Sequence, residues 1–354
     1  MTVSPFDHPL LSALVGDEEA ARAFSFEAEL EAMLAFERAL AKAEAAENVI
    51  PNTAAQAIAA SLAAFQPDMA RLREAVARDG IPVPELVRQL RQAVPEPHRG
   101  HLHFGATSQD VIDSALILRL RPIVELCDRR LMELIVCFAG LDSRFGGRPL
   151  TGVTRMQPAI PILVADRIAA WQRPLERHRG RLSELSPRLL AVQFGGAAGT
   201  LDKLGDKAVA VRQRLAAELR LADAPQWHSQ RDSLAEFASW LSLVTGSLGK
   251  FGQDVALMAL RCGEIQLSGG GGSSAMPHKQ NPVAAETLVA LARFNAAQLA
   301  AMHGSLVHEL ERSGAAWTLE WLVLPQMVVA TAGALRLAVE LADKIDSIGG
   351  GPAG

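Results

Sequence analysis

Apolar side chains recur at intervals of three and four residues along most of the 354-residue chain, the spacing that places them on one face of an α-helix. The pattern is clear over residues 26–51, and it predicts two shorter helices over 53–64 and 68–79. A further short helix is predicted within "GIPVPELVRQL", where prolines precede the apolar repeat. These short elements indicate a small helical N-terminal domain, which we place at residues 1–109.

From residue 110 the apolar runs become much longer. The run at residues 283–312 follows Pro282, a residue suited to the first turn of a helix, and would span roughly 45 Å as one continuous helix. Long helices that are apolar on more than one side must bury those faces against partners. We therefore expect a central long-helix bundle at residues 110–348 that assembles into an oligomer, followed by a flexible tail at 349–354. The other long runs lie at 110–145, 159–192, 201–219 and 232–262.

The residue pattern favours helices, and the composition allows a large hydrophobic core. We find no convincing alternating run of β-branched residues, so the sequence predicts an all-α fold. Hydrophobic residues make up 49% of the chain and charged residues 21%, which allows a large core and excludes a disordered chain. The net charge of −4 gives no electrostatic basis for binding nucleic acid or an anionic membrane. The three cysteines lack metal-like spacing, and the first residues lack a signal-peptide pattern, so we expect no metal, no membrane span and a cytoplasmic location.

Polar clusters interrupt the helical pattern at residues 101–110, 149–158, 225–232 and 268–282. Hydrogen-bond donors at helix ends suit a ligand that carries several carboxylates, because backbone N–H groups and the helix dipole add to the attraction. Taken alone, each cluster is explained more often by capping and turn chemistry. The donor side chains are those of Thr107, Ser108, Gln109, Thr154, Arg155, Gln157, His228, Gln230, Arg231, Ser273, Ser274, Lys279 and Asn281.

The cluster "SGGGGSSAMPHKQNP" at 268–282 is harder to explain as a connector, because ordering four consecutive glycines is entropically unfavourable. Glycine allows the backbone to approach a ligand or to close over one. A serine among backbone amides and beside a lysine can act in proton transfer at carbon. The loop therefore predicts a catalytic site.

Three of these clusters carry a family resemblance. "GSSAMPHKQNP" resembles the signature loop of the fumarase/aspartase superfamily, "HFGATSQD" its first conserved region and "TGVTRMQPAIP" its second, in the same order. The resemblance covers most of the chain, and the loop motif is highly specific. Within the superfamily the sequence is most similar to the 3-carboxy-cis,cis-muconate cycloisomerases, on "TRMQPAIPI", "DRIAAWQRPLERH", "VQFGGAAGT", "WHSQRDSLAEF" and "HELERSGAAWTLEWLVLPQ".

The resemblance implies roles for individual residues. Ser273 is the implied acid or base beside a carboxylate, and His103 or His228 is a candidate proton partner. Lyases of the superfamily carry a Thr-His pair where this chain has Thr154-Arg155, and this arginine could hold an additional anionic substituent. Substrate-binding roles are expected for Thr107, Ser108, Gln109, Thr154, Arg155, Gln157, Arg231, Ser274, Met276, Lys279, Asn281 and Arg312.

The implied reaction is the closure of a 3-substituted muconate to a lactone in aromatic-compound degradation, with no cofactor. The implied architecture is a fumarase/aspartase-like bundle, in a homotetramer whose subunits share active sites. A small third helical domain is usual at the C-terminus of the superfamily, and we expect it to be absent here. The sequence leaves open the 3-substituent, carboxylate or another anion, and the identity of the proton donor.

Three other classes of protein share features with this sequence. An amidase-type hydrolase also has a Gly/Ser-rich segment, but it needs an α/β core and has no place for "MPHKQNP". A structural protein of the lens type would not need the serine, lysine and asparagine of the loop. A carboxylate lyase of the same superfamily, such as an adenylosuccinate lyase, remains the nearest alternative.

Overall fold

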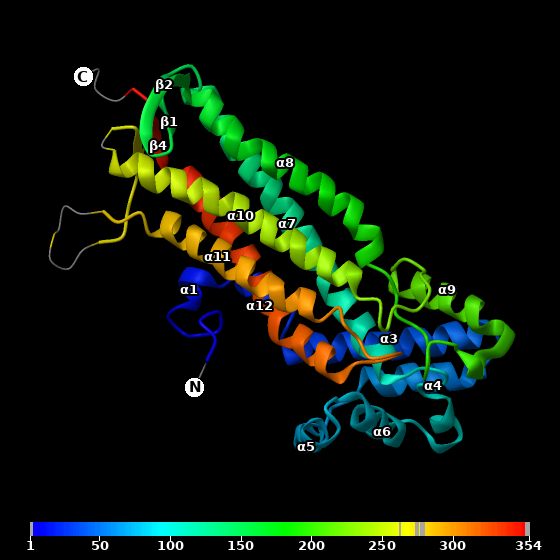
Figure 1. The fold of residues 1–354 in the computed structure, drawn as a ribbon. Coiled ribbons are helices and arrows are strands. Elements are labelled where there is room, and N and C mark those ends of the chain that lie inside the picture. Colours follow the sequence, from blue (N-terminus) through cyan, green and yellow to red (C-terminus); the bar gives the residue numbers. More distant parts are fainter. Residues whose placement is uncertain (1–2, 262, 273–275, 277–279, 351–354) are drawn as a thin grey trace.

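The computed structural model describes residues 3–261, 263–272, 276 and 280–350. Long helices lie side by side along one axis, and the helices of residues 26–93 gather at one end of them (Figure 1). The shorter N-terminal helices are α1 (Ser12–Val15), α2 (Glu18–Arg22), α3 (Phe26–Ala46), α4 (Asn52–Ala63), α5 (Met69–Asp79) and α6 (Val83–Ala93), followed by the 3-10 helix η1 (Glu96–His101).

The bundle confirms the predicted helical class. Aromatic rings pack against one another in its core: the rings of Phe138, Trp171 and Phe251 lie at centroid distances of 4.9 to 5.8 Å. Two glycines bring a pair of helices close together: a Cβ added at Gly249 or Gly252 would lie 2.6 Å from an atom of the neighbouring helix. The elements are α7 (Ser108–Phe145), α8 (Val164–Leu189), η2 (Asp202–Lys207), α9 (Ala208–Leu219), α10 (Asp232–Leu260), α11 (Val283–Gly304) and α12 (Gly314–Asp343).

Two small antiparallel sheets depart from a strictly all-α fold. Strand β1 (Pro149–Thr154) pairs with β2 (Gln157–Leu163), and β3 (Ile265–Leu267) pairs with β4 (Ile345–Ile348). The sequence pattern missed them because β2 contains two prolines and is exposed along most of its length, while β3 has only 3 residues. Neither sheet contributes a layer to the core.

The prediction of one helix over 283–312 was wrong. Helix α11 ends at Gly304, and the Ser305 hydroxyl donates to the carbonyl of Met302 and so helps to close the turn. A loop follows until Ser313, which caps α12 by accepting a hydrogen bond from the backbone of Ala316. Helices α8 and α9 also begin later than predicted, because a strand and a 3-10 helix occupy the preceding residues.

Helix α12 is long and apolar enough to cross a membrane, but 72% of its most apolar window is buried inside the bundle. We therefore interpret it as a core helix, which the sequence analysis did not place among its long runs. Helix α7 begins at Ser108, next to the predicted domain boundary at residue 109. The division into domains remains a prediction.

The bundle has two ends that matter for the site. We call the end where α7, α10 and α12 begin the head end, and the end that carries the β1–β2 hairpin and strand β3 the hairpin end (Figure 1). The hairpin end is tied together by Arg148, which donates to Ser347 at 2.8 Å, and by the backbone of Ser268, which donates to the Lys344 carbonyl at 2.8 Å. Since α7 has 38 residues and rises about 1.5 Å per residue, the two ends lie roughly 55 Å apart.

Candidate active site

The carboxylate of Asp110 holds three segments together at the head end. It is fully buried and accepts backbone hydrogen bonds from Thr107 at the start of α7 and from Gly195 and Gly196, at 2.8 to 2.9 Å. It also lies 2.8 Å from Nε2 of His228. The start of α7, with its positive dipole end, is thereby fixed against two loops.

A second buried cluster lies about one helical turn further along α7. The guanidinium of Arg231 forms paired contacts with Asp113, at 2.7 and 3.1 Å, and also binds the carboxylate of Glu320. Burial lowers the pKa of Arg231, but the charges and hydrogen bonds of the two carboxylates outweigh it, so the guanidinium stays protonated. Burial raises the pKa of Glu320 despite its contact with Arg231. The side chain of Arg231 is 1% exposed, so it supports the site from the protein interior. Direct contact of Arg231 with a substrate stays an untested prediction.

Gln109 and Arg312 link this buried cluster to the surface. The Gln109 amide donates to Asp113 at 3.0 Å and to the carbonyl of His228 at 2.8 Å, and its oxygen accepts from Nε of Arg312 at 2.9 Å. Arg312 is exposed and lies in the loop between α11 and α12. It is therefore a cation held at the rim of the head end, where a substrate carboxylate could meet it.

The other predicted histidine is His103, in the loop that leads into α7. Its Nδ1 lies 2.6 Å from Oε1 of Glu37 on α3. Thr107 and Ser108, which follow in the same segment, are half-buried. The head end thus brings together the predicted residues His103, Thr107, Ser108, Gln109, His228, Arg231 and Arg312.

The predicted residues of the second region lie on a hairpin turn. Arg155 and Met156 both have positive φ, 46° and 65°, which are the signs of a primed hairpin turn between β1 and β2. Thr154, Arg155 and Gln157 are exposed. Their side chains are therefore available to a ligand or to another subunit.

The glycine-rich loop closes at its base through the backbone. Gly271 and Asn281 exchange hydrogen bonds of 2.9 and 3.0 Å in both directions. A Cβ added at Gly270 would lie 2.7 Å from the Gln280 side chain, and one at Gly271 would lie 2.4 Å from Val283. Two of the four glycines are therefore required by close packing at the base of the loop. Met276 is 43% exposed, and Ser273, Ser274 and Lys279 lie outside the described residues.

The described part of the chain does not assemble all predicted residues in one place. Residues 101–110 and the described residues of the segment 268–282 lie at opposite ends of the bundle (Figure 1). No single chain can therefore bring the head end and the hairpin end to one small ligand.

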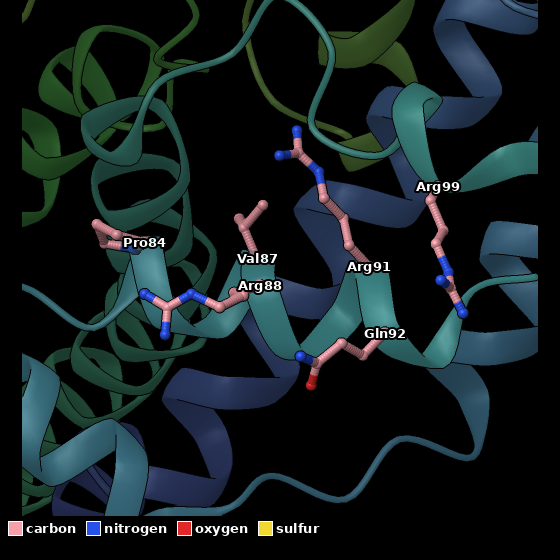
Figure 2. A pocket seen from close by; sticks show the side chains of 6 residues that line it. All are labelled: Pro84, Val87, Arg88, Arg91, Gln92 and Arg99. Carbon is pink, nitrogen blue, oxygen red and sulfur yellow. The ribbon is translucent and has the colours of Figure 1, made fainter. Parts of the chain in front are cut away.

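A separate pocket of about 320 Å³ lies on the outer side of α6 and η1 (Figure 2). Its arginines are engaged locally: Arg88 pairs with Glu85, Arg91 donates to the carbonyl of Leu102, and Arg99 donates to that of Val94. Figure 2 shows their heads pointing in different directions. We interpret them as braces for the N-terminal loops. Among the described residues no group of three His, Cys, Asp or Glu side chains could hold a metal ion.

Sequence reasoning missed the acidic partners at the head end: Glu37, Asp110, Asp113 and Glu320. Asp110 and Asp113 stand one helical turn apart in "DVID", a spacing that could have indicated a shared polar face. Glu37 and Glu320 carry no such signal, because each lies within a helix, away from the polar clusters that interrupt the helical pattern. His308 was also missed; burial, and the nearby Arg231 charge, lower its pKa.

Comparisons with known proteins agree with this architecture. Residues 15–294 match the model of the family described as "Lyase". The chain is 45% identical over 332 residues to a 3-carboxy-cis,cis-muconate cycloisomerase of Pseudomonas aeruginosa, covering 91% of this chain and 72% of that protein. It is 41% identical over 348 residues to the enzyme of the same name from Bradyrhizobium diazoefficiens, covering 96% of this chain and 77% of the relative.

The solved structures give the same result for the fold. The crystal structure of a 3-carboxy-cis,cis-muconate lactonizing enzyme from Pseudomonas putida superposes with a TM-score of 0.89 at 38% identity, covering 95% of this chain and 77% of that one. The long-helix bundle is therefore that of a known enzyme architecture. The chain belongs to the lyase family, within the fumarase/aspartase superfamily.

Proposed function

We propose that the protein is a cycloisomerase that converts 3-carboxy-cis,cis-muconate, or a close 3-anionic muconate, to the corresponding lactone. The observation that carries the proposal is the 45% identity, over 91% of the chain, to an enzyme of that name. The exposed Arg155 at the hairpin turn supports it, because a guanidinium suits the additional carboxylate of such a substrate. The reaction belongs to aromatic-compound degradation, in the protocatechuate branch, and we place the enzyme in the cytoplasm.

The proposed chemistry is an intramolecular addition. One carboxylate oxygen of the muconate attacks an alkene carbon and forms the C–O bond of the lactone. The π electrons move to the neighbouring carbon, next to another carboxylate, and this carbon gains a proton. Ser273 is our candidate for the proton transfer, with His103 or His228 as its partner. No cofactor is part of this scheme.

The remaining predicted residues would bind the substrate carboxylates. Ser274, Lys279 and Asn281 would stabilise the carboxylate on which charge develops, since donors aimed at a developing charge lower the barrier. Thr107, Ser108 and the rim cation Arg312 would hold a second carboxylate at the head end, and Arg155 the third. The buried residues Gln109 and Arg231 would keep these groups in place.

We further propose that the enzyme is a homotetramer whose subunits share each site. The separation of roughly 55 Å between the two ends of α7 supports this, because the catalytic and binding groups must come from different chains. Antiparallel neighbours would place the head end of one chain beside the hairpin end of another. Exposed apolar side chains along the bundle, such as Val136 (61%) and Leu243 (50%), give the long helices second faces to bury.

A direct assay tests the proposed reaction. Purified protein is mixed with 3-carboxy-cis,cis-muconate, and loss of the conjugated-diene absorbance is followed, with the lactone identified by NMR. Rapid loss is expected. No loss, together with turnover of a substrate that releases fumarate, would overturn the cycloisomerase reaction in favour of a lyase.

A further inference from the structure

The structure contains two histidine–carboxylate pairs at the head end, and only one of them is open to a ligand. His228 is 2% exposed, and its Nε2 is taken by Asp110. His103 has a side chain that is 13% exposed, and its Nδ1 is taken by Glu37, which is 1% exposed. Among the described residues, no hydrogen-bond partner is found for Nε2 of His103. This nitrogen is the one free to meet a substrate.

The backbone around His103 is held in an uncommon conformation. His103 has a positive φ of 60°, in the left-handed region that a non-glycine residue adopts only where the surroundings require it. Arg91 braces the preceding residue by donating to the Leu102 carbonyl at 3.1 Å. Strained backbone conformations are found where the surroundings fix the orientation of a functional side chain. Here this conformation aims the imidazole at Glu37, which lies 66 residues earlier in the chain.

The charges that face His103 come from three elements. Burial lowers its pKa, but the charge and hydrogen bond of Glu37 and the charge of Asp110 outweigh burial and the repulsion of Arg91, so the pKa is raised. Glu44, two turns further along α3, does not add a charge: burial, helped by the charge of Glu37, raises its pKa to about 9. The contact with Glu37 therefore favours the protonated form of the His103 imidazole.

We propose that Glu37 is a positioning residue that fixes the His103 ring, so that a protonated Nε2–H is presented to a substrate carboxylate at the start of α7. The inference rests on the proposed function and deepens it. Glu37 itself does not contact the substrate; it determines which nitrogen of His103 faces the site and keeps that nitrogen a donor. The adjacent N-terminus of α7 attracts the same carboxylate.

The main test compares Glu37→Gln with Glu44→Gln. Glutamine keeps the size of both side chains, and Glu44 is neutral below its pKa of about 9, so up to that pH its variant is a matched control from the same helix. In Glu37→Gln the raised pKa of His103 is lost. We expect the alkaline limb of the kcat/KM profile to move down by about one pH unit or more, with roughly tenfold lower activity on that limb. Wild-type enzyme and Glu44→Gln should share one profile. An unshifted profile in Glu37→Gln would overturn the inference.

A second measurement does not depend on activity. Because the folded-state pKa of His103 is raised, the pair stabilises the fold fully below the unfolded pKa of about 6.5 and loses this effect as pH rises through the folded value. The melting point of Glu37→Gln should therefore fall more at pH 6 than at pH 9. The difference should vanish in a His103→Asn background. An equal fall at both pH values would contradict the pairing. A wild-type protein inert toward muconate would overturn the proposed function alone, and the stability cycle would still decide the pairing.

Discussion

The two ends of the bundle use their polar side chains in opposite ways. At the head end, Asp110 and Arg231 are buried and bound on several sides by groups of the same chain. At the hairpin end, Thr154, Arg155 and Gln157 stand on a turn and are exposed. The head end is a largely buried polar network within one chain, whereas the hairpin end presents side chains with room for a ligand or another subunit.

This difference separates stability from activity. A buried ion pair whose partner is removed leaves an uncompensated charge, so changes at the head end should weaken the fold. Exposed polar residues contribute little to stability, so changes of polar side chains at the hairpin end should leave the fold intact and affect only substrate binding or turnover. The four predictions below test that separation.

The largest effect is expected at the glycine-rich loop of the hairpin end. Ser273→Ala should lower kcat by about 10²- to 10⁴-fold, because a positioned proton-transfer group typically contributes that much. The melting point should be unchanged. Steady-state kinetics with 3-carboxy-cis,cis-muconate check the first expectation, and circular dichroism checks the second. Near-normal turnover would remove Ser273 from the mechanism.

The next effect is expected at the head end. Arg231→Met should lower the free energy of unfolding by roughly 3–5 kcal/mol, because Asp113 and Glu320 would be left buried without their partner. Urea denaturation measures the change. The matched control is Arg155→Met, an exposed arginine at the hairpin end, which should stay within about 0.5 kcal/mol of wild type. Equal losses in both variants would erase the distinction between the two ends.

A smaller effect is expected where the glycine-rich loop closes. Gly271→Ala places a methyl group against Val283 and should destabilise the protein by about 1–3 kcal/mol, as overpacking usually does. Gly272→Ala is the control, since an added Cβ there meets nothing within 4 Å. Thermal unfolding distinguishes the two variants. If Gly272→Ala were the more damaging, the packing account of the loop base would be wrong.

The smallest effect is expected for Arg155 and concerns binding alone. Arg155→Gln should raise KM by about tenfold, the loss of roughly one charge-assisted contact, while kcat changes little. The same variant assayed with cis,cis-muconate, which lacks the 3-carboxylate, should show a much smaller change. A uniform loss for both compounds would assign Arg155 to another role.

Sequence patterning predicted the long helices well because their apolar repeats extend over many turns, as in α7 and α10. It failed where local chemistry overrides the repeat. The helix expected over 283–312 ends at Gly304 because a loop with its own hydrogen bonds begins at Ser305. The β1–β2 hairpin escaped notice because its turn uses Arg155 and Met156 at positive φ rather than asparagine and glycine.

The candidate site divides in the same way. Motif residues such as Thr107 and His228 were found because they stand in polar clusters between helices. Their partners were not, because Glu37 and Glu320 lie within helices, away from the polar clusters, and only the fold brings them to His103 and Arg231. The separation of the two ends was also hidden, since motif order along the chain does not give distances in space.

Subunit complementation tests the shared-site proposal most directly. One variant, Ser273→Ala, disables the hairpin end, and a second, Thr107→Val combined with Ser108→Ala, disables the head end. Each alone should be nearly inactive. If each site takes its two halves from different chains, refolding an equal mixture should restore about one quarter of wild-type activity, because random assembly reunites two intact halves at that frequency. A mixture as inactive as its components would show that both halves of a site come from the same chain, and would contradict the account.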